Sequence, residues 1–110
     1  MHHNSSTAEE VMTIMNSEDI LAKLRELRPI ITARYKAKEV GIFGSFVRGE
    51  QSASSDIDIL VEFEDGADLF DLIGLTLYLE EIFQRQVDVV PKRALRAELQ
   101  DSVLRELVVV

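Results

Sequence analysis

Cysteine is absent from the 110-residue chain, and proline and glycine are scarce, with two and five residues respectively. Without cysteine the protein can form neither disulfides nor thiolate metal sites, which agrees with a reducing compartment. The scarcity of proline and glycine, together with 46% hydrophobic residues, argues against a disordered or low-complexity chain. The length and composition predict one small domain around one hydrophobic core.

Long apolar runs are missing as well. No stretch approaches the roughly 20 apolar residues that a membrane-spanning helix needs. The first residues also lack the apolar centre of a secretory signal. We therefore expect a soluble, cytoplasmic protein that makes no use of a membrane.

Positively charged residues are few. The chain has 12 Lys and Arg residues and 20 Asp and Glu residues, which give a net charge of -8. Binding nucleic acid without sequence preference requires a basic surface that displaces counterions. We therefore expect no direct nucleic-acid binding. An acidic surface suits a protein that binds metal ions or a basic partner, and it also serves solubility.

Hydrophobic spacing predicts the helices. Residues 1–16 are interpreted as an N-terminal extension with a short helix, because Thr7–Glu10 has the capping-box pattern. Ser17 is expected to cap the next helix, which Pro29 should kink or restart. Asp68 is expected to cap a third helix, and a fourth should precede the C-terminal valines. The apolar stripes of the last three helices are expected to form the core. They are Ile20, Leu24, Leu27 and Ile31; Leu69, Leu72, Ile73, Thr76, Leu79 and Phe83; and Leu95, Leu99, Val103 and Leu107.

Three short apolar segments predict strands, at 40–43, 57–63 and 87–90. In the second segment, Ile57, Ile59, Val61 and Phe63 should point to one face and Asp56, Asp58, Leu60 and Glu62 to the other. The order of elements predicts a small mixed α/β (α+β) domain over 17–110, with a mixed sheet of about three to four strands flanked by helices.

Two carboxylates stand at the start of the second strand. Asp56 and Asp58 project from the same face, roughly 6.5–7 Å apart along the backbone. Like charges this close repel, and apolar neighbours make the ionised forms costlier still, unless a cation compensates them. Mg²⁺ prefers a few carboxylates, with water and substrate phosphates at its other positions. The pair is therefore a candidate magnesium platform.

Further candidate residues lie on neighbouring elements. Asp88 supplies a third carboxylate, and three such groups can hold two metals about 3.5–4 Å apart for in-line phosphoryl chemistry. Gly44 and Ser45 follow a strand and could bind phosphate oxygens, with Arg48 offsetting phosphate charge. Each feature alone has a simpler explanation: a solvent-facing acid pair, a turn, an edge-strand charge at Asp88, or a structural ion pair at Arg48.

The combined spacing is more specific than its parts. Gly44-Ser45, ten further residues and then Asp56-Ile57-Asp58 resemble the signature of the DNA polymerase beta-type nucleotidyltransferase superfamily. The run GSFVRGEQSASSDIDILVEF is similar to the minimal nucleotidyltransferases of bacteria and archaea. The resemblance implies that Ser45 contacts nucleotide phosphates, that Asp56 and Asp58 hold metals, and that Asp88 completes the site.

The same resemblance implies a function and a partner. It predicts an adenylyltransferase that uses two Mg²⁺ ions to move AMP from ATP, or another nucleoside triphosphate, to a hydroxyl on a protein. The expected acceptor is a HEPN-domain toxin, which makes this chain the antitoxin. One alternative is a non-catalytic module that neutralises a toxin by complex formation, and another is an acidic domain without a ligand. The sequence is also compatible with a homo-oligomer.

Overall fold

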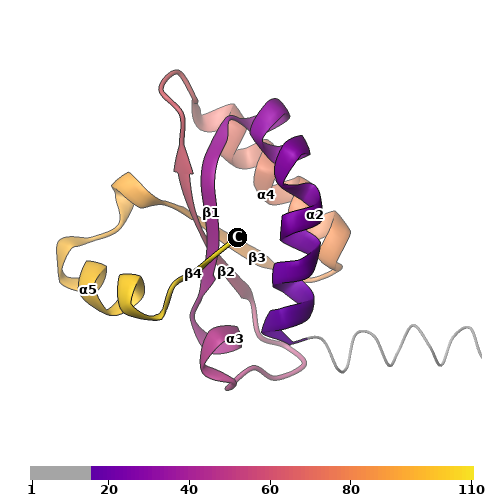
Figure 1. Cartoon of the computed structure of the whole chain (residues 1–110), viewed down its shortest axis with the longest axis vertical. Coiled ribbons are helices and arrows are strands. Elements are labelled where there is room, and N and C mark those ends of the chain that lie inside the picture. Colours follow the sequence, from indigo (N-terminus) through magenta and orange to yellow (C-terminus); the bar gives the residue numbers. More distant parts are fainter. Residues whose placement is uncertain (1–15) are drawn as a thin grey trace, which may run out of the picture.

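The computed structural model describes residues 16–110, so the helix predicted after Thr7 lies outside the described residues (Figure 1). None of the helices within 16–110 combines the length and the apolar character needed to cross a membrane. The elements are α2 (Ser17–Tyr35), β1 (Ala37–Phe43), α3 (Ser45–Arg48), β2 (Ile57–Phe63), α4 (Leu69–Phe83), β3 (Val87–Pro91), the 3₁₀ turn η1 (Lys92–Ala94), α5 (Ala97–Glu106) and β4 (Val108–Val109).

The strands form one four-stranded sheet in the order β3-β2-β1-β4. β2 and β3 are parallel and joined through α4, whereas β1 is antiparallel to both β2 and β4. Helices α2 and α4 lie along one face of the sheet, and α5 stands on the other side (Figure 1). The mixed sheet flanked by helices confirms the predicted fold class.

Helix α2 buries the predicted stripe, since Ile20, Leu24, Leu27 and Ile31 are all buried. The cap is Asn16 rather than Ser17. The Asn16 side chain accepts a hydrogen bond from the Asp19 N–H, and the Asp19 side chain accepts one from the Asn16 N–H. The helix also continues through Pro29 instead of restarting there. Pro29 and Arg25 are both exposed, so water can satisfy the carbonyl that proline leaves without a donor.

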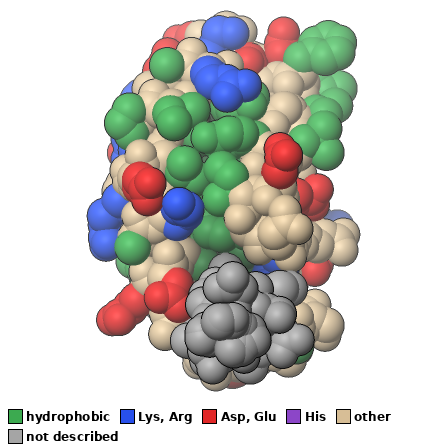
Figure 2. All heavy atoms as spheres, turned by 90° about the vertical axis from the view of Figure 1, so that its right-hand side faces the viewer, with side chains coloured by type: hydrophobic (Ala, Val, Ile, Leu, Met, Phe, Trp, Pro, Cys, Tyr) green, Lys and Arg blue, Asp and Glu red, His purple; other side chains and the backbone are tan. Residues whose placement is uncertain are grey.

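Helix α4 begins at the predicted cap, with a reciprocal capping box between Asp68 and Asp71. The predicted core stripe is only partly right. Leu79 and Phe83 are buried, as is Leu75, but Leu69 is 64% exposed and Ile73 is 46% exposed. With Phe70 and Leu77 they form an apolar strip in solvent, and Figure 2 shows hydrophobic side chains gathered on the face that carries α2 and α4.

Strand β2 has the predicted bounds, and Ile57, Ile59 and Val61 are buried as expected, whereas Phe63 is only half-buried. Leu60, which shares the face of the acids, is nevertheless only 4% exposed. Leu95 and Val103 cover it from η1 and α5, forming a small second core with Leu60 at its centre. The centre of β2 is therefore buried on both faces at Leu60, between Asp58 and Glu62. The two-residue strand β4, which pairs with Gly41 and Ile42, was not predicted.

The cap of α4 gives a test of the fold. Replacing Asp68 with alanine removes the side-chain acceptor for the Asp71 N–H, 3.1 Å away, and leaves that donor only its bond to the Asp68 carbonyl. We expect Asp68→Ala to lower the free energy of unfolding by about 1 kcal/mol. Asp65→Ala, in the exposed turn before the helix, should change it by less than about 0.5 kcal/mol. Urea denaturation of both variants measures the difference, and equal losses would contradict the capping role.

Candidate active site

The sheet brings the candidate acids to one of its ends. In the parallel pairing of β2 with β3, Asp58 lies directly beside Asp88. On its other side, Asp58 pairs with Phe43, the last residue of β1, and Gly44 follows at once. Asp56 comes just before β2. The strand ends therefore gather Asp56, Asp58 and Asp88 beside the turn that carries Gly44 and Ser45, as the sequence predicted.

The three carboxylates interact without forming a finished metal cage. Within residues 16–110, no group of three or more His, Cys, Asp or Glu side chains is arranged to hold a metal ion. Asp58 is half-buried, whereas Asp56 and Asp88 are exposed. Burial raises the pKa of the Asp58 carboxyl, and repulsion from Asp88 and Asp56 raises it further, while Arg48 lowers it. Ionising Asp58 therefore costs more free energy in the folded protein than in the unfolded chain.

The donor chemistry fits Mg²⁺. Carboxylates with open coordination positions are the ligands that this ion takes when it also binds phosphates. The electrostatic cost at Asp58 comes from burial and from neighbouring anions, both of which a bound cation would offset. Asp56, Asp58 and Asp88 are thus suited to hold the metal that the sequence predicted.

Gly44 makes room for Asp58. Its backbone has φ 81° and ψ -153°, a region that only glycine enters readily. A Cβ built on Gly44 would meet Oδ2 of Asp58 at an overlapping distance. The Gly44 N–H does not face solvent, because it donates to Oε1 of Glu106 at 2.7 Å. In this structure, the contribution of Gly44 is therefore the space it leaves and the shape of the turn.

Ser45 begins α3, immediately after Gly44. Within 16–110 its backbone N–H, its hydroxyl and the N–H of Phe46 have no hydrogen-bond partner. The Phe46 side chain is buried, which anchors the turn in the core. The first turn of α3 thus leaves three donors next to the acids, a set that suits phosphate oxygens.

Arg48 ends α3 and lies at the same site. Its Nε donates to Glu50 at 2.9 Å, and its Nη1 lies 3.2 and 3.3 Å from the two carboxylate oxygens of Glu106. These hydrogen bonds, first to Glu50 and then to Glu106, raise the pKa of the Arg48 guanidinium. Glu106 was not among the residues predicted for the site. It lies 62 positions from Gly44, and no local pattern links the two.

The serine-rich loop that leads to Asp56 is held by Arg85. The Nη1 atom of Arg85 donates to the carbonyls of Ser52, Ala53 and Ser55, at 3.3, 3.1 and 2.8 Å. Its guanidinium also lies over the Phe46 ring, 5.3 Å from the centroid. Arg85 precedes β3, so one side chain ties the loop, α3 and the start of β3 together.

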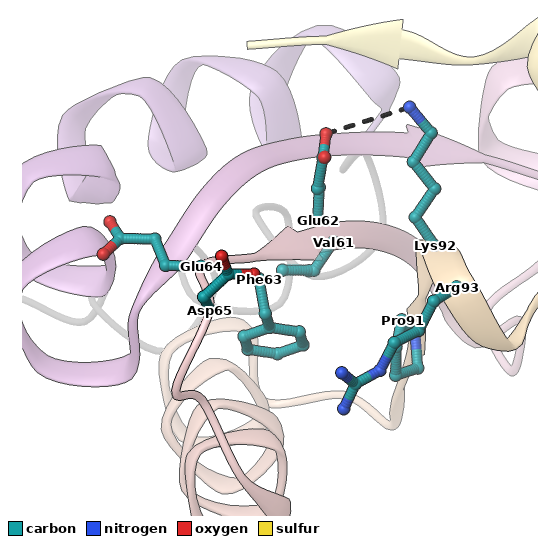
Figure 3. Close-up of a pocket in the computed structure, with 8 residues that line it drawn as sticks. All are labelled: Val61, Glu62, Phe63, Glu64, Asp65, Pro91, Lys92 and Arg93. Atoms are coloured by element: carbon teal, nitrogen blue, oxygen red, sulfur yellow. Dashed lines mark ion pairs between the residues drawn. The ribbon is translucent and has the colours of Figure 1, made fainter.

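One hollow, of about 270 Å³ between α4 and β3, is lined in part by Asp88, whereas other hollows lie away from the acids. Figure 3 shows one of about 250 Å³ at the far end of β2, where Phe63 and Arg93 flank it and Lys92 pairs with Glu62 at 3.8 Å. Phe63 is five residues beyond Asp58, or roughly 16 Å along a strand. That hollow is too distant to share a ligand's reacting atoms with the acids.

Comparison with known proteins gives the same picture over most of the chain. The family model described as "Nucleotidyltransferase domain" matches residues 24–110. The protein adenylyltransferase MntA of Thermococcus cleftensis is 39% identical over 99 residues, which cover 90% of this chain and 100% of the relative. A Methanocaldococcus jannaschii protein assigned as a protein adenylyltransferase is 43% identical over 84 residues, covering 76% of this chain and 89% of its own.

Solved structures agree with these relatives. A protein assigned as a minimal nucleotidyltransferase has a TM-score of 0.74 and 39% identity, covering 86% of this chain and 96% of its own. A chain from a toxin–antitoxin crystal structure with AMP-PNP has a TM-score of 0.63 and 28% identity. That similarity covers 86% of this chain and 72% of the other.

The raised pKa of Asp58 predicts how stability responds to pH. A carboxyl whose folded pKa exceeds its unfolded pKa binds protons more tightly when folded, so its ionisation destabilises the fold as pH rises through that interval. Asp58→Asn should therefore be more stable than the natural protein at pH 7 in metal-free buffer. The advantage should shrink as pH falls through the raised folded pKa and disappear below about 4, near the unfolded pKa of aspartate. Chemical denaturation across this range measures it, and a variant less stable at pH 7 would contradict the assignment.

The close approach of Gly44 and Asp58 predicts a difference between two glycines. Gly49 also has a positive φ, 73°, but a Cβ there would meet no atom within 4 Å. Gly49→Ala should cost about 1–2 kcal/mol, the usual penalty for a left-handed residue. Gly44→Ala should cost clearly more, because the methyl group also displaces the Asp58 carboxylate. Equal losses of unfolding free energy would show that the Asp58 contact is unimportant.

Proposed function

The chain belongs to the nucleotidyltransferase domain family, and from this premise we propose that the enzyme transfers AMP from ATP to a hydroxyl on a protein partner. The observation that carries the proposal is the pairing of Asp58 with Asp88 on adjacent parallel strands, beside the Gly44–Ser45 turn. Carboxylates for metal and free donors for phosphate thus share one end of the sheet. The adenylyltransferase relatives support AMP as the transferred group.

The phosphates are proposed to bind on the α3 side of the site. Ser45 offers its hydroxyl and N–H, and Phe46 offers a second N–H from the same turn. Arg48 adds a guanidinium, which binds phosphate oxygens more strongly than neutral donors do. With β and γ phosphates held there, the α phosphorus would face the acids.

In the transfer step, the acceptor oxygen forms a bond to the α phosphorus. The bond from that phosphorus to the oxygen bridging the α and β phosphates breaks, and pyrophosphate leaves with its electron pair. Asp88 is proposed to take the hydroxyl proton, because it is exposed on the outer strand of the sheet beside Asp58. Asp56, Asp58 and Asp88 would hold Mg²⁺, and the family pattern implies two ions. Those ions would stabilise the negative charge of the phosphates.

The proposed acceptor is a HEPN-domain toxin that this chain neutralises as an antitoxin. A toxin–antitoxin chain with 28% identity shares the fold over 86% of this protein, which supports the setting. The described residues comprise a single sheet with its flanking helices, so an acceptor protein can approach the exposed Asp88. The net charge of -8 favours an acceptor with a basic surface.

Replacing Asp88 separates transfer from binding. Asp88→Asn keeps the shape of the side chain but removes its charge and its capacity to accept a proton. We expect transfer to fall by about 100-fold or more, because a positioned catalytic carboxylate commonly contributes that much. The measurement is the intact mass of a HEPN-domain partner after incubation with ATP and Mg²⁺, where AMP adducts should form with the natural enzyme and vanish with the variant.

Asp65→Asn is the matched control, since it removes the same charge from an exposed turn at the far end of β2. It should transfer AMP at the natural rate. A pull-down of enzyme and partner runs beside the mass measurement. Stable association without any mass change, for natural enzyme and variant alike, would favour the non-catalytic module over the enzyme.

A further inference from the structure

The end of α5 reaches into the turn that is proposed to bind phosphates. Oε1 of Glu106 accepts from the Gly44 N–H at 2.7 Å, and the same carboxylate lies 3.2 and 3.3 Å from Nη1 of Arg48. Its side chain is 25% exposed, compared with 46% for Arg48. One carboxylate from the last helix therefore holds both ends of the Gly44–Arg48 segment.

This contact leaves one edge of the guanidinium available. Arginine has five N–H donors in a rigid plane. Arg48 donates from Nε to Glu50 at 2.9 Å and from Nη1 to Glu106. Its Nη2 has no hydrogen-bond partner among residues 16–110. Arg48 lies close enough to Asp58 to lower the pKa of that carboxyl. The two glutamates thus fix the guanidinium next to the acids with a donor edge unused.

We propose that Glu106 is a positioning residue for the nucleotide, which fixes the Gly44 turn and presents Arg48 to the triphosphate. Holding a long side chain in its binding orientation before the ligand arrives removes the conformational entropy that ordering it would cost. The proposal rests on the proposed function only in that the nucleotide phosphates bind at the Ser45–Arg48 segment.

The C-terminal arm, residues 95–110, places Glu106 there. Val103 is the buried residue of α5, and Leu95 and Leu107 pack with it against Leu60. Immediately after Glu106, β4 pairs Val108 with Ile42 and Val109 with Gly41. Pairing with β1 therefore fixes Glu106 within reach of Gly44, which follows the same strand. The position of this arm and the geometry of the phosphate turn are coupled through one side chain.

Three substitutions at Glu106 test the role, with Kd for ATP and Mg²⁺ measured calorimetrically without any acceptor protein. Glu106→Gln keeps an oxygen for the Gly44 N–H but turns an amide N–H toward Arg48, so the guanidinium is released. We expect ATP to bind about tenfold more weakly, the scale of one charge-assisted hydrogen bond. Glu106→Ala should weaken it further. Glu106→Asp keeps the charge but shortens the reach, and should also weaken binding.

Simple charge repulsion makes the opposite prediction. If Glu106 only adds negative charge near the phosphates, Glu106→Gln and Glu106→Ala should bind ATP more tightly than the natural protein, and that result would overturn the proposal. Glu98→Gln is the matched control, because it makes the same net-charge change at an exposed position of the same helix. It should leave Kd within about twofold of the natural value.

A double-mutant cycle with Arg48 separates positioning from general stability. If Glu106 acts through Arg48, Glu106→Gln should cause little further loss of ATP affinity in an Arg48→Ala background. An undiminished tenfold loss there would overturn the proposal. Natural protein that fails to bind ATP would refute the proposed function itself, whereas tight ATP binding by both natural protein and Glu106 variants would refute only the role of Glu106.

Discussion

The contact between Gly44 and Asp58 is the constraint on which the rest of the site depends. The pairing of β1 with β2 puts Asp58 opposite Phe43, so the chain must turn away at position 44 while a carboxylate oxygen lies where a side chain would start. Only a glycine backbone at φ 81° satisfies both conditions. The turn proposed to hold phosphates and the acid proposed to hold metal therefore cannot move independently.

The parts of this arrangement that repeat locally were predictable from the sequence. Alternation along 57–63 identified β2 with its observed bounds, because a strand buried on one face has a side-chain period of two. The same alternation put Asp56 and Asp58 on one face. The strand, helix, strand order is typical of parallel neighbours, and the structure has Asp88 in register with Asp58 on the parallel strand β3.

Features set by distant packing were not predictable in the same way. Helix α4 carries apolar residues around most of its circumference, so the sequence did not define which stripe is buried, and Leu69 and Ile73 were placed in the core wrongly. Leu60 was expected among the outward residues, because nothing local shows that η1 and α5 cover it. The position of Glu106 beside Gly44 depends on β4, a strand of two residues, which is too short to show an alternating pattern in the sequence.

Charge balance links metal and nucleotide at this site. The turn proposed to hold phosphates lies among acidic side chains, namely Asp56, Asp58, Asp88, Glu50 and Glu106. Arg48 is already shared between two glutamates, and Arg85 is engaged with the loop that leads to Asp56. A triphosphate that approached without cations would add its charge to an acidic cluster that already raises the pKa of Asp58. Cations bound by those acids would reverse the sign of the local field. Binding of metal and binding of nucleotide are therefore expected to be strongly cooperative, with each favouring the other by the same free energy.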